Sequence, residues 1–399
     1  MNELISYQNK LLTRVPNDWH RYLFPEMHNN NRLIGIKGLR GVGKTTMFLQ
    51  YLAFEYAERE KGLYVTSDHP YFYNNTLFDL ASEWSSYGGE LLLIDEVHKY
   101  PNWSRELKLI YDGNPDLRII FTSSSALDLY RGESDLSRRL LTYDLHGLSF
   151  REFLSFHYGL SFREVSLPDI LKDHHQIALE ITREIKVLSY FEEYLLFGYF
   201  PFSKDIGKET FIPRLIRIIN TVLESDLAYS EEYSVANIRK IKKLLGVIAE
   251  TTPFEPNISR IAEKLQLGRN TVTNFLKNLH DAHILNLLSR PGKGSSRLQK
   301  PDKIYFENSS FAHAFENAPE KGTIREIFFM NQLKNAGHQI ELAPGSGDFL
   351  VDRTFTFEVG GKNKGPKQIK GLENSYLALD QIEHGFSDKI PLWLFGFLY

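Results

Sequence analysis

The residues that most directly suggest chemistry form one short glycine-rich segment near the amino end of the chain. The segment fits the pattern of a phosphate-binding P-loop at every fixed position. Glycines let the backbone fold back until its N–H groups converge on phosphate oxygens, and the positive end of the following helix points to the same place. Lys44 would neutralise charge on the β- and γ-phosphates, and the Thr45 hydroxyl would ligate Mg²⁺. The alternative is a glycine-rich strand–helix turn that carries Lys and Thr by chance. We expect the nucleotide to be bound by Gly38, Leu39, Arg40, Gly41, Val42, Gly43, Lys44, Thr45 and Thr46.

Two consecutive acidic residues form a second candidate group. The apolar run Leu91–Ile94 is typical of a buried strand and is followed directly by Asp95 and Glu96. Asp95 would hold the magnesium ion, directly or through a water molecule, and Glu96 would polarise the attacking water as general base. The alternative is an ordinary strand that ends in solvated acids.

Residues near two further strand ends are additional candidates. Ser123–Ser125 follow the run Arg118–Thr122, and Ser124 would reach the attacking water or the γ-phosphate. Serines after a strand are also common turn formers. Arg138 precedes a fifth strand and would complete the site of a neighbouring subunit in a homo-oligomer, as an arginine finger does. An ordinary surface ion pair is the alternative for Arg138.

These candidates require a sheet whose strands all end at one edge. Between residues 33 and 145, short apolar runs alternate with amphipathic stretches, which is the pattern of a parallel sheet covered by helices. The ligand of such a doubly wound α/β domain lies beyond the carboxyl ends of its strands. We expect strands at Leu33–Lys37, Leu63–Thr66, Leu91–Asp95, Leu117–Thr122 and Leu140–Leu145, and helices at Thr45–Glu60, Leu77–Trp84, Trp103–Tyr111 and Ala126–Tyr130.

Composition excludes several classes of protein. The chain has 399 residues, of which 42% are hydrophobic and 24% charged, and this fits two or three globular domains rather than a disordered chain. The absence of cysteine excludes disulfides, thiolate zinc sites and cysteine catalysis. No stretch approaches the ~18 apolar residues of a membrane helix, and the amino end does not resemble a signal peptide, so we expect a cytoplasmic protein without membrane contact. The apolar run Ile390–Tyr399 is expected to form a buried final strand.

With these motifs in place, the chain resembles a known family. Gly38–Thr45, Leu91–Glu96 and the polar end of the fourth strand resemble AAA-type ATPases of the additional-strand class. Leu148–Leu154 and Tyr194–Pro201 are similar to a prokaryotic ATPase group that joins an AAA-type domain to a C-terminal domain of unknown function. The resemblance implies ATP as the nucleotide, its hydrolysis, and a fourth strand that lies beside the first.

The chain after the ATPase-like part divides by pattern into three regions. We expect an ATPase domain at 1–147, a helical lid at 148–235, a winged helix–turn–helix at 236–303 and a nuclease-like α/β domain at 304–399. The helix–turn–helix, with helices at Ile258–Leu265 and Arg269–Asp281, lies in a basic segment: Ala236–Lys303 holds 13 Lys and Arg against 5 Asp and Glu. Such a charge favours DNA as a partner, with a protein-docking or lid role as the alternative. The expected DNA contacts are Arg269 and Asn270 on the second helix and Lys293 and Arg297 in the wing.

The final region carries acids in an order that resembles the restriction-endonuclease-like nucleases. Glu326 is expected on a helix, Asp348 at the start of a strand and Glu358 near the end of the next strand. In those nucleases acids bind magnesium, and a lysine two residues after the second acid helps to position water. Gly360 occupies that position here. Lys362 would share the strand face with Glu358 and substitute for it, unless the two glycines bulge the strand. An inactive relative is favoured over a working nuclease.

The leading hypothesis is a magnesium-dependent ATPase whose nucleotide state moves the attached winged-helix and nuclease-like domains. The alternatives are a DNA-targeting nuclease that ATP licenses, and a nucleotide-dependent scaffold with negligible hydrolysis. Glu96 argues against the scaffold, and Gly360 argues against the nuclease.

Overall fold

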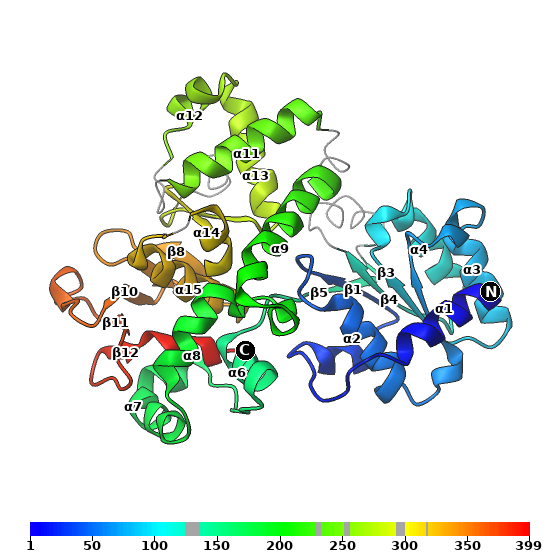
Figure 1. Cartoon of the computed structure of the whole chain (residues 1–399), viewed down its shortest axis with the longest axis horizontal. Coiled ribbons are helices and arrows are strands. Elements are labelled where there is room, and N and C mark those ends of the chain that lie inside the picture. The colour runs from blue at the N-terminus through cyan, green and yellow to red at the C-terminus, as the bar shows by residue number, and fades with distance from the viewer. Residues whose placement is uncertain (124–135, 137, 228–232, 251–255, 293–299, 317) are drawn as a thin grey trace. The chain divides into compact units, whose positions relative to one another are not determined.

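The computed structural model spans the whole chain and describes residues 1–399 except 124–135, 137, 228–232, 251–255, 293–299 and 317. The chain divides into two compact units, Met1–His146 and Gly147–Tyr399 (Figure 1). Among the described residues, no helix combines the length and the apolar character needed to cross a membrane.

The first unit is built on a parallel sheet in the strand order β2-β3-β4-β1-β5. Every residue of β1 and β3 is buried, as expected for strands covered on both faces. The five predicted strands are confirmed to within a residue at each end, and β4 lies beside β1 as the resemblance implied. Their bounds are β1 Leu33–Lys37, β2 Gly62–Thr66, β3 Leu91–Asp95, β4 Arg118–Ser123 and β5 Leu140–Asp144.

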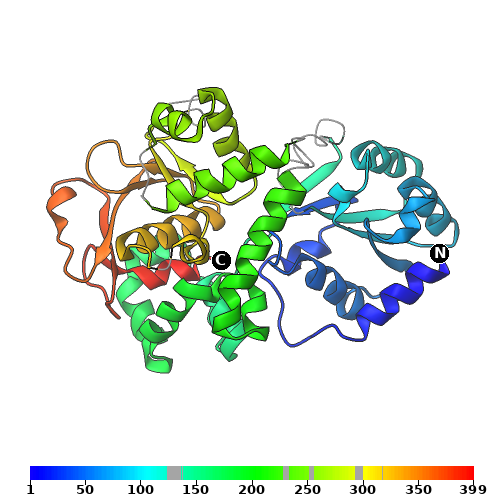
Figure 2. The same ribbon diagram turned by 45° about the horizontal axis from the view of Figure 1, so that its top comes forward.

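Helices cover both faces of this sheet (Figure 2). They are α1 Asn2–Leu12, α2 Lys44–Gln50, α3 Leu77–Ser86 and α4 Trp103–Gly113. The helix predicted to reach Glu60 is shorter: α2 continues as a π-helical turn through Glu55, and Tyr56 is extended. The predicted helix Ala126–Tyr130 lies outside the described residues.

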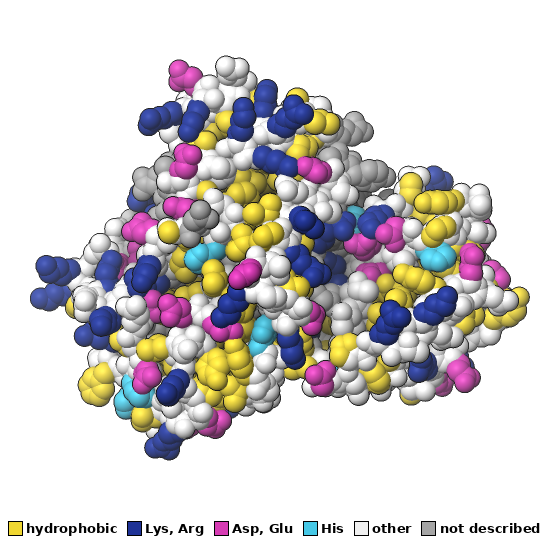
Figure 3. All heavy atoms as spheres, viewed as in Figure 1, with side chains coloured by type: hydrophobic (Ala, Val, Ile, Leu, Met, Phe, Trp, Pro, Cys, Tyr) yellow, Lys and Arg dark blue, Asp and Glu magenta, His cyan; other side chains and the backbone are white. Residues whose placement is uncertain are grey.

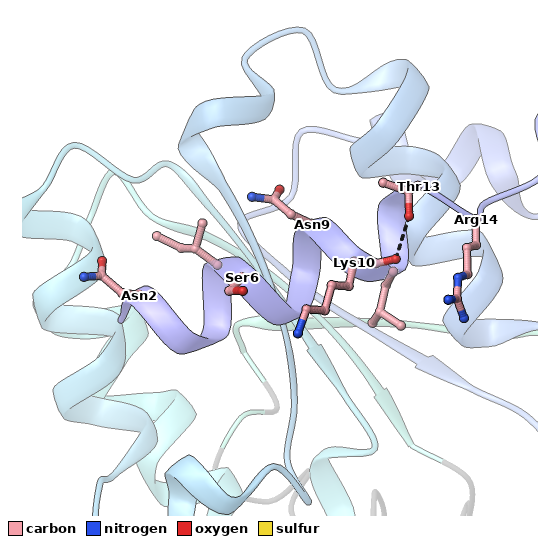
Figure 4. A pocket seen from close by; sticks show the side chains of 8 residues that line it. Asn2, Ser6, Asn9, Lys10, Thr13 and Arg14 are labelled. Atoms are coloured by element: carbon pink, nitrogen blue, oxygen red, sulfur yellow. Dashed lines mark hydrogen bonds between the residues drawn. The ribbon is translucent and has the colours of Figure 1, made fainter.

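Helix α1 closes the outer edge of β2. Leu4, Gln8 and Leu12 form its buried face, and the Gln8 side chain donates to the carbonyl of Gly62 at 3.4 Å and accepts from the N–H of Tyr64 at 2.6 Å. Residues from the rest of the helix line a shallow groove at the surface of about 700 Å³ (Figure 4). This groove holds scattered polar side chains and no paired charges among the residues drawn, so it offers no evident chemistry.

The second unit begins with helices that share one core with the end of the chain. They are α6 Phe150–Tyr158, α7 Leu167–Glu184, α8 Val187–Glu193 and α9 Lys208–Thr221. The ring of Phe150 contacts that of Phe397 at a centroid distance of 5.8 Å, and Phe191 contacts Phe328 at 4.7 Å. Aromatic residues of the predicted lid therefore pack within the core of their own unit.

The basic segment forms a helix–turn–helix next to an antiparallel strand pair. The predicted helices are confirmed at their expected bounds, as α12 Ile258–Leu265 and α13 Arg269–Asp281, and α11 Val235–Ala249 precedes them. β6 Leu285–Leu288 pairs with β7 Lys303–Phe306. Lys and Arg side chains gather over α11 and α12 (Figure 3). The assignment as a winged helix stays a prediction, because the expected wing tip lies outside the described residues.

The last part of the chain packs a mixed sheet against α15 Lys321–Asn335, which α14 Ser309–Phe315 precedes. The sheet order is β12-β11-β10-β9-β8, antiparallel from β8 to β10 and parallel from β10 to β12. The strands are β8 Ile340–Leu342, β9 Phe349–Val351, β10 Phe355–Gly361, β11 Ser375–Asp380 and β12 Lys389–Pro391.

The prediction of a long final strand was wrong. β12 stops at Pro391, which has no N–H to continue a strand ladder, and Leu392–Phe397 form a buried 3₁₀ helix. The run is apolar throughout because it is buried in either conformation, so hydropathy alone does not distinguish a strand from a tight helix.

A buried ion pair holds α15 to the loop after β7. Glu307 is only 1% exposed, and the Nζ of Lys334 lies 3.1 Å from its carboxylate. Burial alone would raise the pKa of Glu307, but the charge of Lys334 and the His283 ring, whose Nδ1 lies 3.9 Å from the carboxylate, outweigh burial and lower that pKa from 4.5 to about 2. The pair therefore stabilises the fold fully above pH 4.5, and its contribution is lost as the pH falls toward 2.

We expect Glu307→Gln to lower the free energy of unfolding at neutral pH by about 2 kcal/mol, because the partly buried Lys334 loses its charged partner and keeps only its hydrogen bond to Asn286. The deficit should shrink as the pH falls from 4.5 toward 2, where Glu307 of the wild type becomes protonated. Urea unfolding over this pH range measures both effects, with the exposed Glu373→Gln as the control. A deficit that does not change with pH would contradict this assignment.

Candidate nucleotide site and other candidate sites

The glycine-rich segment forms a tight loop between β1 and α2. A Cβ atom at Gly38 would lie 2.2 Å from the carbonyl oxygen of Leu145, and Gly43 has a φ of 99° at the start of α2. Both positions therefore require glycine, one for close backbone approach and one for a left-handed conformation. The loop lies at the carboxyl end of β1, where a doubly wound sheet binds its ligand.

The Lys44 side chain folds back over this loop. Its Nζ donates hydrogen bonds to the carbonyls of Gly38 at 2.6 Å and Leu39 at 3.0 Å, and the residue is 8% exposed. The ammonium group is thus fixed among the loop residues that are expected to surround the phosphates.

Asp95 is the centre of the polar contacts in this site. Its carboxylate is nearly buried, at 3% exposed, and the Thr45 hydroxyl donates to its Oδ2 at 2.6 Å. The hydroxyl of Tyr64 on β2 donates to the same oxygen at 3.0 Å, and the hydroxyl of Thr122 on β4 donates to Oδ1. The two predicted magnesium ligands, Thr45 and Asp95, are therefore in direct contact.

Tyr64 serves this cluster as a permanent hydrogen-bond donor. Burial raises the pKa of its phenol well above the usual range, and the negative charge of Asp95 raises it further. The phenol consequently keeps its proton at any physiological pH.

Glu96 follows Asp95 in a left-handed conformation, with φ of 52°. Its backbone N–H donates to the Thr122 hydroxyl at 2.9 Å, which fixes the turn at the end of β3. The Glu96 side chain is 23% exposed and lies between two cations, Lys99 and Arg40. Glu96 therefore lies beside the phosphate loop on a turn of strained backbone, and its role as general base stays a prediction.

The sequence reasoning missed several residues of this site. Tyr64 and Thr122 come from the strands on either side of β3, and a polar residue near the end of an apolar strand was the available signal for Thr122. Arg21 is 4% exposed and donates to the carbonyl of Val42 in the loop and to that of His146 at 2.7 Å. No local pattern marks Arg21, because its partners lie far along the chain.

Of the other two predicted catalytic residues, the structure describes only Arg138. Ser124 lies outside the described residues. Arg138 is exposed in the turn before β5, at the amino end of the strands and thus at the opposite edge of the sheet from the loop. It does not reach the site of its own chain, so a role in a neighbouring subunit stays a prediction.

The helix–turn–helix contains a polar groove of about 910 Å³. Predicted contact residues Arg269 and Asn270 both line it, and Lys277 and Lys300 add two further cations. Among the described lining residues none is acidic. The other predicted contacts, Lys293 and Arg297, lie outside the described residues.

The predicted nuclease-like acids are close enough to influence one another. Burial raises the pKa values of Glu326 and Glu358, and the charge of Asp348 raises both further, although Lys364 acts in the opposite direction on Glu358. Over the described ranges, however, no three or more His, Asp or Glu side chains are grouped so that they could hold a metal ion. Tyr305 donates to Glu326 at 2.6 Å.

The assignment of Lys362 to this acidic group was wrong. β10 ends at Gly361, so Lys362 lies in the following turn, where it is exposed. The chain turns back there, and Lys364 forms the ion pair with the fully buried Glu358. The two glycines do not bulge the strand, since both stay in register with β11.

Family comparisons agree with the nucleotide site. Residues 30–154 match a family described as an AAA domain, and residues 188–322 match a domain of unknown function. The first match supports an AAA-type P-loop ATPase that binds nucleotide.

Two uncharacterized proteins of Methanocaldococcus jannaschii are similar over most of the chain. One is 26% identical over 379 residues, which cover 87% of this chain and 79% of the relative. The other is 23% identical over 318 residues, which cover 77% of this chain and 67% of the relative. The names of these two relatives do not state an activity.

The solved structures that resemble the chain do so distantly. A Walker-type ATPase of Pyrococcus abyssi is 14% identical with a TM-score of 0.38, over 73% of this chain and 93% of that one. AMPPCP-bound DnaA from Aquifex aeolicus is 15% identical with a TM-score of 0.28, over 70% and 89%. Likenesses at this level carry no functional argument.

Proposed function

We propose that the first unit binds ATP with Mg²⁺ and hydrolyses it to ADP and phosphate. The observation that carries this proposal is the contact between Thr45 of the loop and the buried Asp95, with Glu96 next to it in the chain. The match of residues 30–154 to an AAA domain supports the same activity.

The residues present fit a magnesium ion. Mg²⁺ prefers oxygen ligands, and a threonine hydroxyl and a carboxylate are already within hydrogen-bond distance of each other here. When bound, the ion would neutralise charge on the β- and γ-phosphates. Thr45 and Asp95 would hold it, and Lys44 and the loop N–H groups would hold the phosphates.

Glu96 would act on the water. It takes a proton from the attacking water while the water oxygen bonds to the γ-phosphorus. The bond from that phosphorus to the oxygen bridging to the β-phosphate breaks, and ADP leaves with the electron pair.

We also propose that nucleotide binding is transmitted to the second unit. Arg21 supports this step, because its guanidinium binds both the loop carbonyl of Val42 and the carbonyl of His146. His146 is the last residue of the first unit, and the second unit begins at Gly147. A movement of the loop would therefore act directly on the junction between the units.

Lys44→Ala should reduce ATP turnover by about 10²-fold or more, because the loop loses its fixed positive charge where the phosphates carry theirs. Phosphate release and titration with a fluorescent ATP analogue measure turnover and binding. Lys10→Ala on the exposed face of α1 is the control and should behave as wild type. Normal turnover by Lys44→Ala would rule out this assignment of the loop.

Glu96→Gln should keep nucleotide affinity and lose turnover by ~10²-fold or more, as expected when a general base is removed. If affinity fell by the same factor, Glu96 would be a magnesium ligand or a structural residue instead. A wild type that binds ATP but releases no phosphate would favour the nucleotide-dependent scaffold.

DNA binding by the helix–turn–helix is a second candidate function. The groove beside α13 favours it, since Arg269, Lys277 and Lys300 line it without an acid among the described lining residues. Asn270 in the first turn of α13 provides a side chain that suits base-edge contacts. A partner whose surface is a row of phosphates matches this charge.

If both side chains contact phosphates, Arg269→Ala combined with Lys277→Ala should make the dependence of log affinity on log salt shallower by about two units. Fluorescence anisotropy titrations of duplex DNA at several salt concentrations measure the slope. Lys172→Ala combined with Lys208→Ala removes two cations of the same unit outside the basic segment and is the control. No binding by the wild type even at low salt would leave the groove as a protein-docking surface.

For the final region we propose a nuclease-like unit that is degenerate. The pairing of Lys364 with Glu358 supports this, because the lysine neutralises the acid that a catalytic metal ion would need. ATP-licensed DNA cleavage is the alternative, and Mg²⁺-dependent cutting of plasmid DNA that is lost in Glu358→Gln would establish it.

A further inference from the structure

The carboxylate of Glu96 is held by two cations from different elements. The Nζ of Lys99, three residues further along the chain, forms an ion pair with Oε2. The guanidinium of Arg40, from the phosphate loop, lies 3.4 Å from Oε1. All three side chains are less than a third exposed, so solvent screens these contacts less than it would at an open surface.

Lys99 has a second acidic partner that lies outside the phosphate loop. Lys99 also binds Asp68 at 2.6 Å, just beyond the end of β2, and Asp68 in turn accepts a hydrogen bond from Thr66 at 2.5 Å. Partial burial would lower the pKa of Lys99, but its bonds to Asp68 and Glu96 outweigh this and raise it. Lys99 is therefore a charged link between the ends of β2 and β3.

Arg40 belongs to the loop that is expected to surround the phosphates. A γ-phosphate carries negative charge of its own and competes with Glu96 for the guanidinium. Lys99, in contrast, is tied to a second acid outside the loop. Of the two cations, Lys99 is the one that would stay with Glu96 when nucleotide binds.

We propose that Lys99, anchored by Asp68, is a positioning residue that orients Glu96 toward the attacking water. The inference rests on the proposed ATP hydrolysis and adds to it the group that fixes the base. A free glutamate side chain has several rotamers, and only a carboxylate within hydrogen-bond distance of the water takes its proton. Lys99 fixes Oε2, which leaves Oε1 to accept from water once Arg40 turns to the phosphates.

The test is a double-mutant cycle measured on the full chain. Lys99→Met keeps the aliphatic stem and removes the charge, Asp68→Asn removes the anchor, and Lys99→Arg restores a cation. Lys61→Ala is a matched control, because Lys61 also lies between two acids, Glu58 and Glu90, but near the amino ends of β2 and β3. Turnover, affinity for a fluorescent ATP analogue and the melting temperature are measured for each variant.

Lys99→Met should lower kcat at least about 10-fold with nucleotide affinity and melting temperature close to those of Lys61→Ala. Lys99→Arg should recover most of the turnover. Asp68→Asn should lower kcat in the wild type and have no further effect in the Lys99→Met background, since the two residues act as one unit. Should Lys99→Met fail to fold, Asp68→Asn still tests the anchor.

Three outcomes would overturn the proposal: wild-type kcat in Lys99→Met, a loss of affinity as large as the loss of turnover, or additive effects of the two variants. Failure of the underlying ATP hydrolysis is distinguished from these, because the wild type itself would then release no phosphate.

Discussion

The first unit depends on keeping one carboxylate, Asp95, buried and hydrogen-bonded at the end of β3. A buried charge without partners costs several kcal/mol, so the hydroxyls of Thr45, Tyr64 and Thr122 are required for the fold as well as for any chemistry. These donors come from the phosphate loop and from the strands on both sides of β3. Three neighbouring strands and the loop are thereby joined through Asp95, and a ligand that engages this carboxylate competes with these hydrogen bonds.

The parts of the fold that were predictable are those whose signal is local. Strands β1 to β4 of the first unit are short runs of mostly buried residues, and α12 and α13 have one apolar face each, so the residue pattern predicts their bounds closely. The prediction for the end of the chain was wrong because Leu392–Phe397 forms a buried 3₁₀ helix. A segment that is buried on all sides does not show the alternation of apolar and polar residues by which a half-buried strand is recognised. The prediction for Lys362 was wrong for a related reason. The alternation of side chains along a strand would put Lys362 on the same face as Glu358, but β10 ends at Gly361.

In the candidate site, too, some residues were predictable from local sequence and others were not. Lys44, Thr45, Asp95 and Glu96 lie in two contiguous motifs, and the chemistry of each motif is legible from residue types alone. Tyr64, Lys99 and Arg21 act through partners that only the strand order and the loop path bring close. The role of a side chain that positions another side chain leaves no pattern of residue types and spacing in the sequence. Such a residue can be identified only from the structure.

The side chain of Gln8 has a consequence for how this unit meets other molecules. Its amide donates to Gly62 and accepts from Tyr64, which are the two bonds that a residue of a neighbouring parallel strand would make opposite Leu63. The side chain of Gln8 thus satisfies the outward-facing backbone groups of Gly62 and Tyr64, as a sixth strand beside β2 would do. Because a bare strand border is a template on which further chains can add, α1 acts as a guard against uncontrolled self-association. In a shortened chain that lacked this helix, the outer N–H and C=O groups of β2 would be open to pairing with a strand of another copy.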